Sequence, residues 1–197
     1  TVVTATDDGN IYIWGAKQLK EPISSINKHQ PARLEEMSSH HSLNAVSLDL
    51  STRALAAGAQ NGTITTWRVI TEPPLQQIQG HEGWVYDVTF SPDGRQLASA
   101  GQDGLVRLWD SDSGARLLDI YPNAGEVTGV DYSPDDKALA TVAEDGSLVF
   151  WDPSNAEKLR SFDGHTAWVW DVAFSPDGDL IGTASSDGTI KLWDVAN

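Results

Sequence analysis

Residues 81–110 read HEGWVYDVTFSPDGRQLASAGQDGLVRLWD, and this stretch decides the fold. Residues 84–90 alternate apolar and polar side chains, as a half-buried β-strand does. The Ser-Pro-Asp-Gly turn at 91–94 ends that strand, because proline presets φ and glycine tolerates a positive φ. A second strand is predicted over 96–100, and the Asp-Gly pair at 103–104 is a strong hairpin signal. The pattern therefore predicts short antiparallel strands joined by tight turns.

The rest of the unit completes a four-stranded sheet. A third strand is predicted over 105–109 and a fourth over 116–120. Val85 and Val88 both look core-facing, although strict alternation cannot place them on one face. An extra residue between them, as a β-bulge, restores the pattern, and the last repeat shows the same spacing at Val169, Val172 and Phe174. Four short antiparallel strands per repeat are typical of a propeller blade.

This unit recurs along the chain. Five apolar runs end in tryptophan, and the last four tryptophans are each 42 residues apart: Trp14, Trp67, Trp109, Trp151 and Trp193. A turn pair begins six residues before each of them, at Asp8, Asn61, Asp103, Asp145 and Asp187. A repeat of this length indicates stacked copies of one unit, none of them stable alone. We place the repeats at approximately 1–40, 41–80, 81–122, 123–164 and 165–197, with the last lacking its outer strand.

The first spacing is longer because it contains an insertion. Trp14 and Trp67 are 53 residues apart, which an insertion of 13 and a deletion of two explain. The insertion lies within residues 15–40, a polar stretch that we interpret as a long surface loop. Residues 33–37 are expected to supply the outer strand there.

Composition bounds the functions that the chain can perform. The formal net charge is −15, with 28 acidic against 13 basic residues, so the surface repels a phosphate backbone or an anionic membrane. We therefore expect neither nucleic acid nor membrane as a partner, and the charge either serves solubility or favours a basic partner. The absence of cysteine excludes disulfides and cysteine-based zinc sites. No signal-peptide pattern is seen at the start, and we expect a cytoplasmic protein.

The repeats resemble the WD40 family of β-propellers, in a tandem style similar to that of bacterial members. The resemblance is carried by Gly80-His81 and Gly164-His165, by the Ser-Pro-Asp-Gly turns at 91–94 and 175–178, and by Trp-Asp at 109–110, 151–152 and 193–194. Signature, spacing and order recur together over nearly the whole chain. The resemblance implies an all-β, WD40-like propeller of four-stranded antiparallel blades, without cofactors.

The resemblance also implies a hydrogen-bond relay inside each regular blade. An indole N–H only donates, so a buried tryptophan needs an acceptor, and a Ser or Thr lies ten residues before most of these tryptophans. Its hydroxyl can accept from the indole and donate to histidine, which donates to the hairpin aspartate. The expected relay residues are His81, Ser99, Asp103 and Trp109, then Thr141, Asp145 and Trp151, then His165, Thr183, Asp187 and Trp193. Repetition and burial favour this structural role over a hydrolase triad.

Other repeats depart from the relay pattern. In the second repeat Ala57 and Asn61 replace the hydroxyl and the aspartate, and in the fourth Asn123 stands where histidine is expected. The first repeat has the hydroxyl of Thr4 but lacks its histidine. We expect these blades to be less stable, because an unpaired buried polar group lowers the free energy of unfolding by about 1–3 kcal/mol.

Counting strands gives about 4.7 blades, each of four strands in the complete repeat. The chain begins near a second strand and ends just after the third strand at Trp193. Propellers of the resembled family usually close with seven or eight blades, and unpaired blade edges are prone to aggregation. We therefore predict an incomplete segment of such a ring, with the remaining blades supplied by the same longer chain. A shorter closed ring, or completion by a second chain, is the alternative.

The resemblance places partner peptides on the face around the central channel. The candidate partner-binding residues are Trp84, Tyr86, Glu126, Glu144, Trp168 and Trp170, with Asp7 beside them. The aromatic residues form two pairs spaced two apart, so the members of each pair share a face. An aromatic and acidic rim suits a peptide that contains Lys or Arg. The alternative is that the tryptophans only pack over the next blade.

We therefore predict a non-enzymatic scaffold that binds a protein or peptide, as the sensor or interaction region of a larger signalling protein. Two alternatives stay open: a propeller with a catalytic or cofactor site in its channel, and a purely architectural subunit. A cluster of His, carboxylate or Arg side chains at recurrent inner-strand positions would favour the catalytic alternative, and we identify none in the sequence. His40 and His41 are interpreted as structural residues, so no metal site is predicted.

Overall fold

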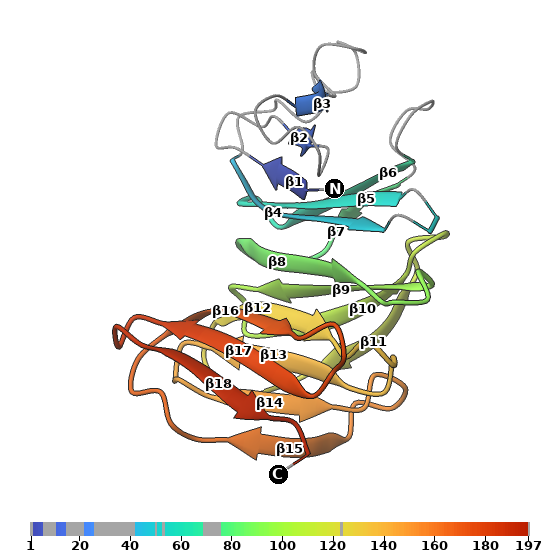
Figure 1. Ribbon diagram of the computed structural model, residues 1–197. Helices are drawn as coiled ribbons and strands as arrows, with labels where there is room; N and C mark the ends of the chain where they lie inside the picture. The colour runs from blue at the N-terminus through green and yellow to red at the C-terminus, as the bar shows by residue number, and fades with distance from the viewer. Residues whose placement is uncertain are drawn as a thin grey trace.

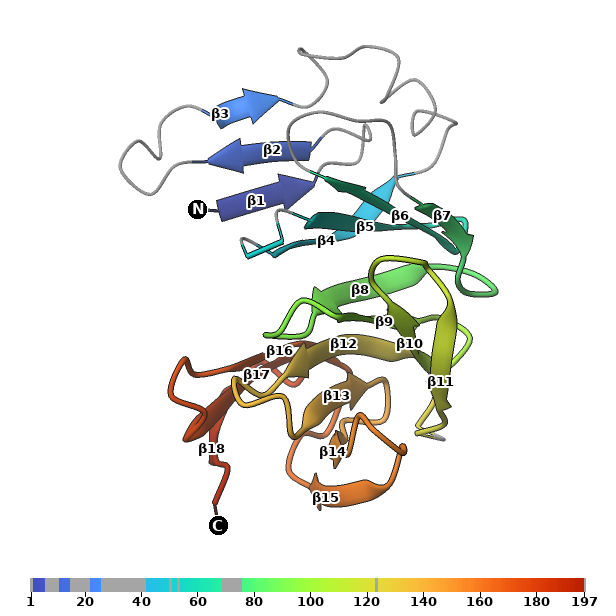
Figure 2. The ribbon, with the colours of Figure 1, turned by 90° about the vertical axis from the view of Figure 1, so that its right-hand side faces the viewer.

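The computed structural model describes residues 2–5, 11–14, 22–25, 42–49, 51–52, 54–68, 76–122 and 124–196. Within these ranges the regular structure is entirely β-strand, and no helix there could cross a membrane. The described strands form five antiparallel sheets, and chain neighbours pair within each sheet. The sheets follow one another in chain order as the blades of a β-propeller (Figures 1 and 2). The predicted all-β propeller fold is confirmed.

The blades are numbered here in chain order. Blade 1 contains β1 (Val2–Ala5), β2 (Ile11–Trp14) and β3 (Pro22–Ser25). Blade 2 contains β4 (Leu43–Asp49), β5 (Ala54–Ala59), β6 (Thr63–Arg68) and β7 (Gln76–Gln79). Blade 3 contains β8 (Val85–Phe90), β9 (Gln96–Gly101), β10 (Val106–Asp110) and β11 (Arg116–Ile120). Blade 4 contains β12 (Val127–Tyr132), β13 (Leu139–Ala143), β14 (Leu148–Trp151) and β15 (Lys158–Phe162). Blade 5 contains β16 (Val169–Phe174), β17 (Leu180–Ser185) and β18 (Ile190–Asp194).

The inner strands β4, β8, β12 and β16 contact one another in chain order and carry the same irregularity. Near the start of each inner strand, its register against the second strand of the same blade shifts by one residue, as in a β-bulge. The shifts lie at Leu43/Ala45, Val85/Asp87, Val127/Gly129 and Val169/Asp171. In β8 this bulge buries both Val85 and Val88. The residue between Val85 and Asp87, Tyr86, stays half-buried on the rim of the blade. The bulge therefore lets both valines point into the core while the extra residue stays at the surface of the blade.

The hydrophobic core lies between the blades rather than inside any one of them. One cluster joins blade 3 to blade 4 through Ala98, Ala100, Val106, Leu108, Val127, Val130, Tyr132, Leu139 and Trp151. Corresponding clusters lie between blades 1 and 2, blades 2 and 3, and blades 4 and 5. Burial of apolar surface stabilises by about 25 cal/mol per Å². Each blade therefore depends on its neighbour for stability.

Blade 1 corrects one sequence-based expectation. In blades 2, 3 and 4 the second strand contacts the inner strand of the next blade. The strand β1 contacts β4, the inner strand of blade 2, in the same way. It is therefore the second strand of blade 1. The strand beside β2 is β3, with Pro22 opposite Trp14, and not residues 33–37 as expected. A proline cannot donate to the ladder but is tolerated on an outer strand. The insertion at 15–40 thus contains a strand, while residues 33–37 lie outside the described ranges.

Candidate functional site

His81 connects three elements of blade 3 through its two ring nitrogens. The histidine is buried just before β8, and its Nε2 lies 2.7 Å from Ser99 Oγ on β9. Its Nδ1 lies 2.8 Å from Asp103 Oδ1 in the turn between β9 and β10. Trp109 on β10 donates its indole N–H to Ser99 Oγ at 2.9 Å. With Nδ1–H donating to Asp103, Nε2 accepts the hydroxyl proton of Ser99, so every member has a partner.

Blade 5 repeats this arrangement with threonine in place of serine. His165 Nε2 lies 2.7 Å from Thr183 Oγ1, and its Nδ1 lies 2.8 Å from Asp187 Oδ2. Trp193 donates to Thr183 Oγ1 at 3.0 Å. The hydroxyls of both relays are buried, which leaves no room for a substrate at a serine or threonine nucleophile. The relays are therefore structural links across three strands.

Blade 4 keeps half of the relay. Trp151 donates its indole N–H to Thr141 Oγ1 at 2.9 Å. Asp145 accepts the backbone N–H of Ser147 at 2.9 Å and so holds its own turn. Asn123, where histidine was expected, lies outside the described residues.

Blade 2 shows what a missing hydroxyl does. Ala57 occupies the place of Ser99 and is buried. The indole Nε1 of Trp67 is consequently buried and has no hydrogen-bond partner among the described residues. Among the described residues, the side chain of Asn61, which replaces the hairpin aspartate, accepts the N–H of Thr63 at 3.1 Å.

Arg107 adds a charge to the relay of blade 3. Its Nη1 lies 2.7 Å from Asp103 Oδ2 and equally close to His81 Nδ1. Because Nδ1–H donates to Asp103, the guanidinium bonds the carboxylate and merely contacts the ring. Burial alone would raise the pKa of Asp103, but the hydrogen bonds from His81 and Arg107 outweigh it and hold that pKa well below its usual range. Asp103 is therefore ionised at neutral pH.

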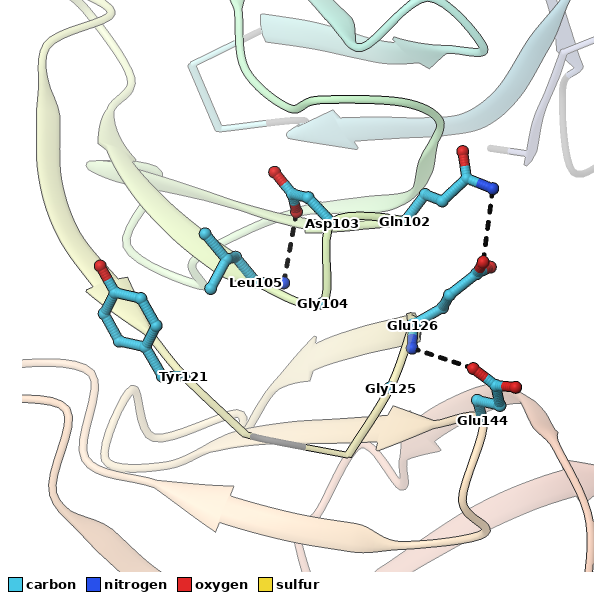
Figure 3. A pocket seen from close by; sticks show the side chains of 8 residues that line it. All are labelled: Gln102, Asp103, Gly104, Leu105, Tyr121, Gly125, Glu126 and Glu144. Atoms are coloured by element: carbon cyan, nitrogen blue, oxygen red, sulfur yellow. Dashed lines mark hydrogen bonds between the residues drawn. The ribbon is translucent and has the colours of Figure 1, made fainter.

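A pocket of about 390 Å³ opens between blades 3 and 4, where the inner strand β12 begins. We call the side of the propeller that carries this pocket the channel face. The lining residues are Gln102, Asp103, Gly104, Leu105, Tyr121, Gly125, Glu126 and Glu144 (Figure 3). Two of the predicted partner-binding residues, Glu126 and Glu144, thus lie in one pocket. The sequence interpretation missed Gln102 and Tyr121, although Gln102 holds the same place before a hairpin aspartate as Glu144 does.

Hydrogen bonds fix the two carboxylates of the pocket across the blade boundary. Tyr86 donates its hydroxyl to Glu126 Oε2, and Gln102 Nε2 donates to Glu126 Oε1 at 3.4 Å. Glu144 Oε2 accepts the backbone N–H of Glu126 at 3.3 Å, and Gln102 Oε1 accepts that of Trp84 at 3.2 Å. Burial and the bond to Glu126 raise the pKa of Tyr86, so its hydroxyl stays a donor. The pocket is therefore an ordered site with an acidic wall.

The aromatic residues lie in pairs on the blades to either side. The Trp84 and Tyr86 ring centroids are 6.0 Å apart on blade 3, and those of Trp168 and Trp170 are 5.1 Å apart on blade 5. Trp84 is 41% exposed and Trp170 52% exposed. Blade 4, between them, carries the two glutamates. Asp7, the further acid named from the sequence, lies outside the described residues.

Aspartates on the inner strands form a second polar feature. Asp87 Oδ1 accepts the N–H of Val88 at 2.8 Å, while its Oδ2 accepts that of Val130 on β12 at 2.9 Å. Asp131 Oδ2 accepts the N–H of Phe174 on β16 at 2.8 Å. Burial raises the pKa of Asp87 to about 7 and that of Asp131 to about 6, and the charge of Asp171 adds to both shifts. These two carboxylates therefore link each inner strand to the next by a hydrogen bond, which we call a carboxylate clasp.

The sequence interpretation did not name these inner-strand carboxylates. Asp87 and Asp171 occupy equivalent bulge positions, and the repeated Asp-Val pairs at 87–88 and 171–172 were the available signal. The bonds of Asp87 and Asp131 go to backbone amides of neighbouring blades, so these groups serve the fold. In the part of the chain that the structure describes, no three His, Asp or Glu side chains are placed to hold a metal ion.

The geometry defines a class of protein: a β-propeller of tandem blades, fastened by tryptophan relays. The family model "WD domain, G-beta repeat" matches residues 72–110, 116–152 and 156–194, which together are more than half of the chain. The chain belongs to the WD40-repeat family. WD40 propellers are commonly protein-interaction scaffolds.

Two known proteins illustrate the similarity. A protein of Arabidopsis thaliana named "Non-functional target of rapamycin complex subunit LST8-2" is 27% identical over 93 residues, which are 47% of this chain and 29% of that relative. The match thus spans less than a third of the relative's length. The crystal structure of the computationally designed Ika4 protein superposes with a TM-score of 0.69 at 25% identity, over 78% of this chain and 91% of that one.

Proposed function

We propose that the protein is a non-enzymatic scaffold whose channel face captures a peptide segment of a protein partner through a Lys or Arg side chain. The observation that carries the proposal is the pocket between blades 3 and 4, in which Glu126 and Glu144 are held beside exposed aromatic rings. WD40 propellers commonly serve as interaction scaffolds, and the relative from Arabidopsis is named as a complex subunit. Both facts support a binding role.

The charge of the pocket favours a cation. Glu126 and Glu144 line the pocket from blade 4, and Gln102 reaches toward Glu126 from blade 3 (Figure 3). Glu144 Oε1 has no hydrogen bond from any described residue, so it can accept one from a ligand. A guanidinium or ammonium group that enters here meets two carboxylates in a partly desolvated place, where an ion pair is stronger than in open water. The net charge of −15 extends this attraction over a longer range.

The aromatic pairs would hold the rest of the peptide. Trp84 and Tyr86 stand at the edge of the pocket on blade 3, and Trp168 and Trp170 form the corresponding pair on blade 5. Exposed tryptophan and tyrosine are enriched among residues that dominate binding energy. A peptide that lies from blade 3 to blade 5 would place its basic residue over blade 4.

Fluorescence anisotropy with labelled peptides tests the proposal. A library of short peptides with one Arg or Lys is compared with matched peptides carrying Gln or citrulline at that position. Glu126→Gln with Glu144→Gln should weaken binding of the basic peptides at least tenfold, and Glu157→Gln, an exposed acid beyond β14, serves as the matched control. Equal affinity for basic and neutral peptides, or equal loss in the control, would refute the cation site.

A further inference from the structure

The carboxylates that line the pocket between blades 3 and 4 differ in how many hydrogen bonds they already accept. Asp103 accepts two at each oxygen. Its Oδ1 accepts from His81 and from the N–H of Leu105, and its Oδ2 accepts from Arg107 and from the N–H of Glu82. A carboxylate has about four lone-pair sites in all. Asp103 therefore has no acceptor site left for a ligand, although it is ionised.

Glu126 is the second carboxylate of the pocket, and blade 3 binds both of its oxygens. Tyr86 donates its hydroxyl to Oε2, and Gln102 donates its amide N–H to Oε1 at 3.4 Å. All three side chains are half-buried, so these bonds form in a partly desolvated place. Because each oxygen has two lone pairs, Glu126 can accept at most one further hydrogen bond at each oxygen.

Glu144 keeps the most acceptor capacity. Its Oε2 accepts the backbone N–H of Glu126 at 3.3 Å, and its Oε1 accepts nothing from the described residues. A side-chain carbon added at Gly125 would lie 2.7 Å from Glu144 Oε2, so this carboxylate rests directly on the backbone and is held in place. No Lys, Arg or His in the part of the chain that the structure describes forms an ion pair with either glutamate. The pocket thus offers one open oxygen beside three that are already bound once.

This pattern of acceptors suits an ammonium group better than a guanidinium group. An ammonium is a compact charge whose three N–H donors point in different directions, so it can bond single oxygens of two carboxylates. A guanidinium is planar and binds best when one carboxylate presents two free oxygens to two parallel N–H groups. Neither Glu126 nor Glu144 has two free oxygens. A guanidinium in this pocket would therefore lose one bond of its fork.

We propose that Tyr86 and Gln102 make this pocket selective for a primary ammonium group over the guanidinium group of arginine. Both residues act by binding the oxygens of Glu126 that a guanidinium fork would need. The ammonium belongs to a lysine side chain or to the N-terminus of a peptide, since both present the same three donors. The inference rests on the proposed function, because it concerns the same pocket, and it deepens that function by naming the cation and the residues that select it.

An NMR titration of the 197-residue protein tests the selectivity. The probes are acetyl-Gly-Lys-Gly-amide, acetyl-Gly-Arg-Gly-amide and unacetylated Gly-Gly-Gly-amide, and a pH of about 6.5 keeps every amine protonated. The N–H resonance of Glu126 reports binding, because this group bonds to Glu144. The lysine peptide should bind at least about tenfold more tightly than the arginine peptide, which is the loss expected for one charge-assisted hydrogen bond. Comparing the lysine peptide with the triglycine amide then assigns the source of the ammonium.

Two variants test the residues that set the preference. Tyr86→Phe frees Glu126 Oε2 and should lower the ratio of the arginine to the lysine dissociation constant to about threefold or less. Gln102→Ala should lower the ratio in the same direction, and any effect common to both peptides cancels in the ratio. Tyr132→Phe is the matched control, because Tyr132 donates its hydroxyl to Gln96 Oε1 at 3.0 Å and neither residue lines the pocket. The control should leave the ratio unchanged.

The outcomes separate this inference from the proposed function. Equal binding of the lysine and arginine peptides, with both lost in Glu126→Gln combined with Glu144→Gln, would overturn the selectivity and leave the cation site intact. A lysine preference that survives both Tyr86→Phe and Gln102→Ala would overturn the role of these two residues. If no probe at millimolar concentration shifts the Glu126 resonance, the proposed function is wrong and this inference fails with it.

Discussion

The unpartnered indole of Trp67 gives the sharpest test of the relay. Blade 2 differs from blades 3, 4 and 5 because Ala57 provides no hydroxyl, and no residue that the structure describes accepts a hydrogen bond from the buried Trp67 Nε1. Ala57→Thr introduces the side chain that blade 4 carries at the same place, Thr141, where the hydroxyl accepts the Trp151 indole at 2.9 Å. Ala57→Val is the matched control, because valine has nearly the same shape without the hydroxyl.

The magnitude follows from the hydrogen-bond balance. Both variants add the same volume beside Trp67, so any packing cost cancels in the comparison. The threonine additionally satisfies one buried donor, which contributes about 0.5–1.5 kcal/mol net. Its own proton has an acceptor in the strand opposite, since Thr141 donates to the Val149 carbonyl and Thr65 stands in that position in blade 2. We expect the free energy of unfolding of Ala57→Thr to exceed that of Ala57→Val by about 1 kcal/mol.

Urea denaturation followed by tryptophan fluorescence measures this difference. The urea concentration at the unfolding midpoint should be higher for Ala57→Thr, while the dependence of the unfolding free energy on urea stays the same. Such a shift of the midpoint alone is a change of stability. The indole N–H resonance of Trp67 should in addition exchange more slowly with solvent in Ala57→Thr than in Ala57→Val. If the two variants have the same midpoint and the same indole exchange, the hydrogen bond from the indole to the hydroxyl does not stabilise the blade.

Three further predictions concern the relay, the inner strands and the channel face. Asp103→Ala should lower the melting temperature more than Asn61→Ala, because Asp103 accepts bonds from His81 and Arg107 while the Asn61 side chain accepts one from Thr63; equal shifts in calorimetry would contradict this. Burial raises the pKa values of Asp87 and Asp131 above the unfolded value of about 4, so the folded state binds more protons and stability should fall as pH rises from about 4 to about 7. Asp87→Asn should flatten that slope in melting curves, and an unchanged slope would show that Asp87 does not titrate in this range. Trp84→Ala combined with Trp168→Ala should leave the circular dichroism spectrum unchanged and abolish partner capture in a pull-down, whereas recovery of the same partners would refute the surface assignment.

The repeat made most of the fold predictable, because the same local signals recur at fixed spacing. Apolar alternation, the Ser-Pro-Asp-Gly turns and the Asp-Gly hairpins act over a few residues, and the strand predicted at 116–120 is β11 (Arg116–Ile120). The exception lies in the insertion after Trp14. There no repeat guides the alignment, and the strand next to β2 is β3 rather than residues 33–37.

The sites were less predictable because they lie between repeats. Glu126 and Glu144 were named from the sequence. They line one pocket with Gln102 only because blade 4 packs against blade 3. Asp87 accepts the N–H of Val130, 43 positions away. The repeated Asp-Val pairs mark the aspartates in the sequence, but they do not show which amide each aspartate binds.

The sequence by itself determined the repeat, the strands, the turns and the members of the tryptophan relay, since each depends on contacts within one blade or on side-chain chemistry. Only the tertiary structure decided which faces are covered, which carboxylates meet and which apolar residues stay exposed. Those properties depend on the stacking of one sheet against another. Val106 and Leu108, for example, are buried because blade 4 packs on them, and their repeat alone does not show this.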